Sequence, residues 1–208
     1  MSIGDGRVSN EITPDRLDPG TRRRGAVLET ALLDAAWEEL TNVGFGRFTI
    51  EGVATRSGTS RTVIYRRWAT RPQLALAAMR HYWEAHPVAV PDTGNLRDDL
   101  ITYLSDLLAK RGDLAGFFLG TGLQQYFEET HTSLGELREE VIRSADFRDE
   151  LYDRAIERGE IDPQKLTPRV KALPANLMIY EYFLTRKPVP QSVIAEIIDQ
   201  IFLPLVRF

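Results

Sequence analysis

The stretch that decides the fold is residues 49–68, which read TIEGVATRSGTSRTVIYRRW. Thr49 is a favourable N-cap for a short helix that we expect to end at Ser57, and Ser60 is placed to cap a second helix of similar length. Between them, Gly58 tolerates the positive φ that a three-residue turn often needs. Two short helices joined by a glycine-containing turn have the geometry of a helix-turn-helix unit.

The second helix of this unit carries side chains suited to nucleic acid. If Ile64 and Trp68, one turn apart, face the core, helical spacing turns the neighbouring positions outward. Arginine can bind guanine through two hydrogen bonds, threonine can contact a base edge, and tyrosine can donate its hydroxyl to phosphate. Arg71 opens the next helix, where free amides also favour phosphate. The predicted DNA-binding residues are Arg47, Thr49, Arg61, Thr62, Tyr65, Arg66, Arg67 and Arg71.

The distribution of charge favours this interpretation, although the formal net charge of the 208 residues is −4. Residues 22–80 hold ten arginines and five acidic residues, whereas residues 81–208 hold 14 basic and 21 acidic residues. Because the field of a charge is screened within about 10 Å, a basic segment can bind a polyanion although the whole chain is acidic. The alternative is an ordinary solvated helical surface.

The whole chain is predicted to be all-α, with about nine helices, because no strand-like alternation of useful length occurs. Residues 1–21 mix Gly, Pro, Ser and Asp without an apolar period, and we expect a disordered tail there. A three-helix domain is predicted at 22–70, followed by a connecting helix and a Pro- and Gly-containing linker at 71–94. The larger, C-terminal helical domain is predicted at 95–208.

Helix boundaries in this larger domain follow from capping residues. Gly112 is expected to end a helix that Asn95 begins, and Ser133 with Glu136 forms a capping box for one helix that runs to about Arg158. The last helix is more hydrophobic than a surface helix requires, which indicates either a dimer contact or simple core packing. Its apolar residues are Ile194, Ile197, Ile198, Ile201, Phe202 and Leu205.

Residues 22–79 resemble the TetR family of bacterial transcriptional repressors. Gly44, Thr49, Val53-Ala54, Ser57-Gly58, Ser60, Ile64-Tyr65, Trp68, Arg71 and Leu74 fall where that family has Gly, Thr, Ile-Ala, Ala-Gly, Ser, Leu-Tyr, Phe, Lys and Leu. The chain departs from the family at Thr62, Val63 and Arg67, where a Gly, a Thr and an aromatic residue or His are frequent. These departures should leave the fold intact and alter which bases are read.

The resemblance implies a homodimeric repressor that binds a palindromic double-stranded DNA operator and dimerises through its last two helices. It also implies a small-molecule effector, bound in the C-terminal domain, that releases the protein from DNA. Large aromatic residues and a polar anchor could line the effector pocket, although many such aromatics are ordinary core residues. The ligand-binding candidates are Tyr103, Phe118, Tyr126 and Asn176.

Other classes of function find little support in the sequence. The chain has no cysteine, and its histidines, His81, His86 and His131, lack partners at a trustworthy ligand spacing, so no metal and no cofactor are predicted. No nucleophile elbow or phosphate-binding loop occurs, and we expect no enzymatic activity. The longest uncharged run, residues 114–127, is too short to span a membrane, so a cytoplasmic protein is expected. The alternative is a helical small-molecule-binding protein or enzyme with no DNA role.

Overall fold

In the computed structural model, the structure describes residues 19–118, 123–142, 147–185 and 187–208, and the regular secondary structure in them is helical. For residues 19–24, 115, 118, 147 and 148 only the backbone is described. No strand occurs within these ranges, which confirms the all-α prediction. The predicted tail lies outside the described residues up to residue 18, and the first helix begins slightly earlier than predicted, at Pro19.

The N-terminal half closely follows the sequence-based prediction. Thr49 caps α2, because its hydroxyl accepts a hydrogen bond from the amide of Gly52 at 3.0 Å, and Gly58 ends this helix with φ of 65°. Ser60 stands at the N-cap position of α3, but its side chain makes no capping hydrogen bond, contrary to expectation. The elements are α1 (Pro19–Val43), a 3₁₀ turn (Phe45–Arg47), α2 (Ile50–Ser57), α3 (Arg61–Tyr65) and α4 (Arg71–Ala85).

The C-terminal half departs from the prediction in two places. The fifth helix continues through Gly112, and the single helix expected after Ser133 is divided in two. This division accounts for the difference between the nine helices predicted and the ten found in the described residues when the last run is counted once. The elements are α5 (Leu96–Phe118), α6 (Gln124–Thr130), α7 (Leu134–Val141), α8 (Phe147–Glu157), α9 (Pro168–Thr185), α10 (Gln191–Glu196), a π-helical segment (Ile197–Phe202) and α11 (Leu203–Val206).

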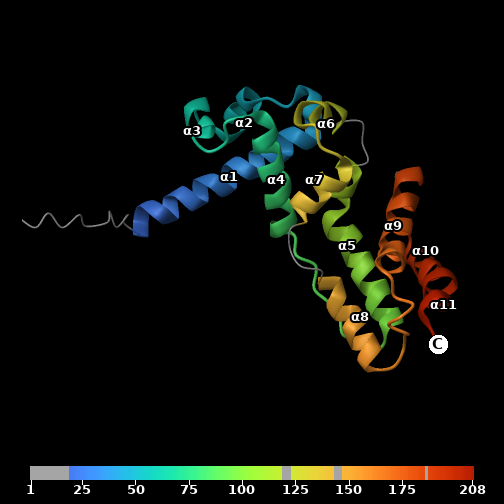
Figure 1. Cartoon of the computed structure of the whole chain (residues 1–208). Coiled ribbons are helices and arrows are strands. Elements are labelled where there is room, and N and C mark those ends of the chain that lie inside the picture. The colour runs from blue at the N-terminus through green and yellow to red at the C-terminus, as the bar shows by residue number, and fades with distance from the viewer. Residues whose placement is uncertain (1–18, 119–122, 143–146, 186) are drawn as a thin grey trace, which may run out of the picture.

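Two hydrophobic cores divide the molecule differently from the predicted boundary at residue 94. The first core joins α1, α2, α3 and α4 to the end of α5 and to α6 and α7, through buried residues such as Leu40, Met79 and Tyr126. The second core lies among the first turns of α5, α8, α9 and the last helix. Helix α5 runs between the two groups of helices (Figure 1). The helix-turn-helix region therefore shares its core with part of the C-terminal half.

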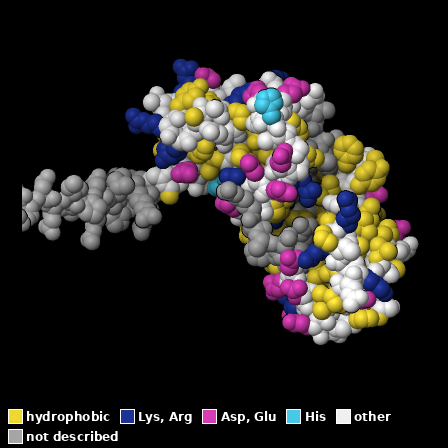
Figure 2. All heavy atoms as spheres, viewed as in Figure 1, with side chains coloured by type: hydrophobic (Ala, Val, Ile, Leu, Met, Phe, Trp, Pro, Cys, Tyr) yellow, Lys and Arg dark blue, Asp and Glu magenta, His cyan; other side chains and the backbone are white. Residues whose placement is uncertain are grey.

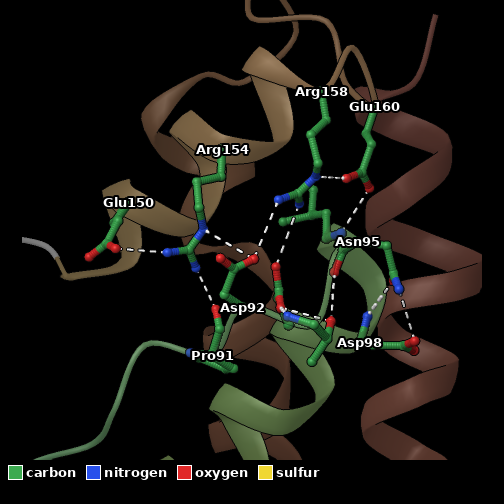
Figure 3. A network of polar contacts seen from close by, with 11 residues as sticks. Pro91, Asp92, Asn95, Asp98, Glu150, Arg154, Arg158 and Glu160 are labelled. Atoms are coloured by element: carbon green, nitrogen blue, oxygen red, sulfur yellow. Dashed lines mark hydrogen bonds and ion pairs between the residues drawn. The ribbon is translucent and has the colours of Figure 1, made fainter.

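A network of charged residues fixes the linker between α4 and α5 against α8 (Figure 3). Arg154 donates to the carbonyl of Pro91, and Arg158 forms ion pairs with Glu160 and with Asp99, the latter at 3.5 Å. Glu160 in turn accepts a hydrogen bond from the amide of Leu96, the first residue of α5, at 2.8 Å. Asp99 is fully buried and also accepts hydrogen bonds from the amide of Thr93 at 2.6 Å and from its hydroxyl at 2.8 Å.

The last helix divides its apolar residues between the core and the surface. Ile194, Ile198 and Phe202 are buried in the second core, whereas Ile201 and Leu205 are exposed. Its π-helical segment ends at Phe202, two residues before Pro204, which has no amide hydrogen to donate to a carbonyl in the preceding turn. Part of this helix therefore packs in the core, and the dimer contact expected from its apolar residues stays a prediction.

Candidate nucleic-acid interface

Helices α2 and α3 are held as a unit by buried apolar side chains. Ile50, Val53 and Ile64 are buried in the first core, and Trp68 packs against it while remaining partly exposed. As predicted, the opposite face of α3 is exposed, and it carries Arg61, Thr62, Tyr65 and Arg66. Basic side chains lie along the outer edge of the molecule near α2 and α3 (Figure 2).

A carboxylate occupies the same surface as these predicted DNA contacts. Glu51, in the first turn of α2, accepts a hydrogen bond from Nη1 of Arg61 at 2.8 Å, and both side chains are more than half exposed. This hydrogen bond, together with one from the backbone amide of Glu51 itself, lowers the pKa of the Glu51 carboxyl. The same pair raises the pKa of Arg61. The predicted base-reading arginine therefore has a carboxylate partner on the protein itself.

The residues that flank α3 differ in how far they are committed to protein contacts. Arg47 is exposed and donates from Nε to the carbonyl of Val43 at 3.3 Å. Thr49 is exposed, although its hydroxyl is used in the cap of α2. Arg67 forms an ion pair with Glu29 of α1 at 3.7 Å, which turns part of its charge towards that helix.

Arg71 is set apart from the other predicted DNA contacts by its protein partners. Its Nη1 donates to the carbonyls of Phe45 and Phe48, each at 3.2 Å, and its guanidinium lies 4.5 Å from the centre of the Phe45 ring. Its Nε donates to Glu129 of α6 at 3.1 Å, and Nη2 also pairs with this carboxylate. Arg71 thus joins α4 to the 3₁₀ turn and to the C-terminal half.

The structure does not bring the predicted ligand-binding residues together. Tyr103 is buried in the second core, and Tyr126 is buried in the first, edge-on to Phe45 at 5.1 Å. Asn176 is exposed on α9, and the side chain of Phe118 lies outside the described part of the chain. A groove of about 510 Å³ between α5 and α10 is lined by other residues, namely Arg97, Asp98, Ile101, Thr102, Gln191, Ser192 and Ala195.

The described residues show neither a metal site nor a membrane-spanning helix. Within the described ranges, no three histidine or acidic side chains are grouped so that they could bind a metal ion. None of the described helices combines the length and the apolar character that crossing a membrane would need.

Sequence reasoning missed the carboxylates that bind these arginines. Glu51 was visible as the one acid among six arginines between Arg47 and Arg71, and this isolation was a usable signal. Glu129 follows Arg71 by 58 positions, and no local pattern connects the two. Only the packing of α6 against the 3₁₀ turn and α4 brings them together.

Both halves of the chain match models of one family. Residues 32–78 match the model described as bacterial regulatory proteins of the tetR family. Residues 90–201, more than half of the chain, match the tetracyclin repressor-like C-terminal domain. The two matches together include most of the buried residues of both cores.

Curated relatives and solved structures agree with these matches. The chain is 28% identical over 190 residues to the DNA-binding transcriptional repressor TetR of Mycobacteroides abscessus, covering 88% of this chain and 96% of that protein. It is equally 28% identical over 181 residues to an uncharacterized HTH-type transcriptional regulator of Mycobacterium tuberculosis, covering 85% of this chain and 86% of the relative.

Two solved structures share the fold at low sequence identity. A putative TetR-family transcriptional regulator from Mesorhizobium loti superposes with a TM-score of 0.63 at 15% identity, over 89% of this chain and 99% of that one. The fatty acid degradation regulator FadR from Bacillus halodurans superposes with a TM-score of 0.60 at 16% identity, over 83% and 96%. At this identity the likeness concerns the fold.

Proposed function

The chain belongs to the TetR family of bacterial regulatory proteins, and on that premise we propose that it is a sequence-specific DNA-binding transcriptional regulator. In this proposal it is a repressor in the cytoplasm that a small-molecule effector releases from a palindromic operator. It works through binding alone, without a catalytic step. The observation that carries the proposal is the exposed face of α3, where Arg61, Thr62, Tyr65 and Arg66 stand on a helix anchored by Ile64.

The chemistry of this face suits the major groove. Arg61 and Thr62 lie at the start of α3, and the N-terminal residues of a recognition helix are those that reach base edges. Tyr65 and Arg66 follow one turn later and suit phosphate, which receives most hydrogen bonds in protein–DNA complexes. We assign Arg47 and Thr49 to contacts with the DNA backbone on either side of these bases. Arg67 and Arg71 would contribute only after loosening their ion pairs with Glu29 and Glu129.

A homodimer is the second element of the proposal. On α9, Tyr180, Phe183 and Leu184 share one exposed face, and the adjacent last helix exposes Ile201 and Leu205. Hydrophobic side chains gather along the edge of the molecule formed by these helices (Figure 2). Two such helices can form a four-helix bundle with their copies around a two-fold axis, and this symmetry fits a palindromic operator. One recognition helix alone contacts too few base pairs for useful specificity.

The effector would act through the shared packing of the two halves. The first core contains residues of α6 and α7 as well as of α4 and the helix-turn-helix. A ligand that shifts α6 or α7 would therefore also shift α4, which packs against them in this core. Operator and effector must then weaken the binding of each other by the same factor. The alternative of a helical binding protein or enzyme with no DNA role is not favoured, since relatives over most of the chain are transcriptional regulators.

Selection from random DNA tests the proposal directly. The full chain is incubated with random duplexes of about 30 base pairs, and the retained fragments are sequenced. We expect palindromes with half-site centres about ten base pairs apart. Replacing Arg61 with Ala should weaken binding to the selected duplex by about tenfold or more, whereas Gln164→Ala, on an exposed loop of the C-terminal half, should not. Equal affinity for selected and random duplexes would refute a sequence-specific role.

The sign of regulation is measured separately. A reporter placed behind the selected duplex is compared in cells with and without the chain. A repressor lowers expression, and the Arg61→Ala variant restores it.

A further inference from the structure

Glu51 is an unexpected residue on a surface proposed to bind a polyanion. It is the only acid between Arg47 and Arg71, and its side chain is 58% exposed. A carboxylate on such a surface repels phosphate within a Debye length of about 10 Å. Its pairing with Arg61 connects the first turn of α2 to the first residue of α3, which are the two helices of the motif.

We propose that Glu51 is a positioning residue that sets the sequence preference of the interface by holding the guanidinium of Arg61 for a base edge and away from phosphate. This inference rests on the proposed DNA-binding function. Glu51 makes no favourable bond to DNA in this proposal and acts on the sequence preference through Arg61.

The geometry of the pair suits this role. The hydrogen bond to Glu51 uses Nη1 of Arg61, whereas a two-bond contact to O6 and N7 of guanine can be made through Nε and Nη2. An arginine held by one terminal nitrogen loses less conformational freedom when the remaining N–H groups meet a base. The Arg61 side chain is 62% exposed while it is paired with Glu51, so its remaining N–H groups are open to solvent.

The charge of Glu51 contributes in a second way. The Glu51 carboxyl, ionised at neutral pH even at its usual pKa of 4.5, has its pKa lowered further, first by the hydrogen bond from Arg61 and then by its own backbone amide. A fixed negative charge beside Arg61 partly neutralises it as a phosphate contact on any sequence. A guanine at the correct position still offers two acceptors to the guanidinium. Discrimination therefore comes from weakening the wrong complexes as well as from stabilising the right one.

The matched control is Glu38, on α1. It is an exposed acid that also pairs with an arginine, Arg56, at 3.4 Å, so its replacement with Gln removes the same charge from the same half of the chain. The experiment uses the duplex selected by the wild-type chain, the same duplex with each base pair changed in turn, and random duplex. Affinities are measured by competition over a series of salt concentrations for wild type, Glu51→Gln, Glu38→Gln, Arg61→Ala and the double variant Arg61→Ala/Glu51→Gln.

We expect Glu51→Gln to bind random duplex more tightly, with a salt slope steeper by up to about 1, because one repulsive charge is lost. Its ratio of selected to random affinity should fall by about five- to tenfold, with the loss confined to the guanine that Arg61 reads. Glu38→Gln should keep this ratio within about twofold. Adding Glu51→Gln to Arg61→Ala should leave the ratio of Arg61→Ala unchanged, since Glu51 then has nothing to hold.

Two results would overturn the inference. One is a Glu51→Gln variant that keeps the wild-type ratio while its thermal unfolding shows a folded protein. The other is an equal fall of the ratio in the presence and absence of Arg61, which would show that Glu51 acts by another route. A wild-type chain that enriches no sequence would instead refute the proposed function itself, and the two failures are thus distinguishable.

Discussion

Replacing Arg71 with Ala separates a structural role from a DNA contact. Each of its two hydrogen bonds to the carbonyls of Phe45 and Phe48 is charge-assisted, and about 1 kcal/mol apiece is a conservative value at a partly exposed site. The ion pair with Glu129 adds about 0.5–1 kcal/mol after solvent screening, and the contact with the Phe45 ring adds about 0.5 kcal/mol. We expect Arg71→Ala to lower the free energy of unfolding by about 3 kcal/mol.

Urea denaturation at fixed protein concentration measures this loss, and the salt dependence of DNA binding is measured in parallel. If Arg71 mainly joins α4 to α6 and the 3₁₀ turn, the salt slope of the folded variant stays within about 0.3 of wild type, whereas loss of a phosphate contact lowers it by about 0.9. Arg71→Lys is the matched control, because lysine keeps the charge but cannot make the forked contacts. Wild-type stability together with the lower slope in Arg71→Ala would refute the structural role.

The pH dependence gives a second test of the same link. The hydrogen bond from Arg71 is the largest cause that lowers the pKa of Glu129 from its usual value of 4.5. A carboxyl whose pKa is lower in the folded state stabilises the protein above its unfolded pKa, and this contribution is lost as the pH falls through the folded value. The difference in stability between wild type and Arg71→Ala should therefore narrow as the pH falls below about 4.5. A difference that is constant over this range would exclude the ion-pair contribution.

Three further changes test the fold and the assembly. Thr49→Ala should lower the free energy of unfolding in urea by about 1 kcal/mol, because it removes the cap of α2. The control Ser60→Ala removes no capping bond and should lower it by less than about 0.5 kcal/mol, and equal losses would contradict the cap assignment. Leu184→Glu should convert the proposed dimer to a monomer in light scattering, because it places a charge on the exposed face of α9. The control Gln164→Glu should remain dimeric, and a dimeric Leu184→Glu variant would show that the interface lies elsewhere. Asp99→Ala should lower the free energy of unfolding by about 2–4 kcal/mol, because the buried carboxylate accepts hydrogen bonds from the Thr93 amide at 2.6 Å and the Thr93 hydroxyl at 2.8 Å. Replacing the exposed Asp92 with Ala should lower it by less than about 1 kcal/mol. Similar losses in thermal unfolding would mean that burial is not decisive.

Local sequence signals predicted the N-terminal half well because its structure is decided within a few residues. The cap at Thr49 and the left-handed glycine at Gly58 each act over one helical turn, and both boundaries of α2 are confirmed. The exposed face of α3 followed from the burial of Ile64 and helical spacing alone. Two local expectations failed. Ser60 occupies the N-cap position, but its hydroxyl makes no capping bond, and α3 ends at Tyr65, so Trp68 lies beyond the helix and not one turn along it.

The C-terminal half was harder because its decisive contacts are distant in sequence. Glycine is unfavourable inside a helix by about 1 kcal/mol, yet α5 continues through Gly112. Burial of this long helix in both cores outweighs that cost. The predicted ligand residues were chosen by type, and type does not separate a pocket aromatic from a core aromatic. Tyr103 and Tyr126 prove to belong to different cores.

The placement of acids explains how a chain with a net charge of −4 can present a DNA-binding surface. Of the 30 acids, 21 lie beyond residue 80, whereas the segment from Arg47 to Arg71 contains only Glu51. Three acids pair with arginines on or beside α3. Glu51 pairs with Arg61, Glu29 pairs with Arg67, and Glu129 binds Arg71 from the opposite half of the chain. Each arginine on or beside the recognition helix with a carboxylate partner is therefore less available as a general phosphate contact. Arg47 and Arg66 are both exposed, and we expect their charges to contribute most to non-specific binding. Sequence preference and salt dependence should therefore respond to different arginines.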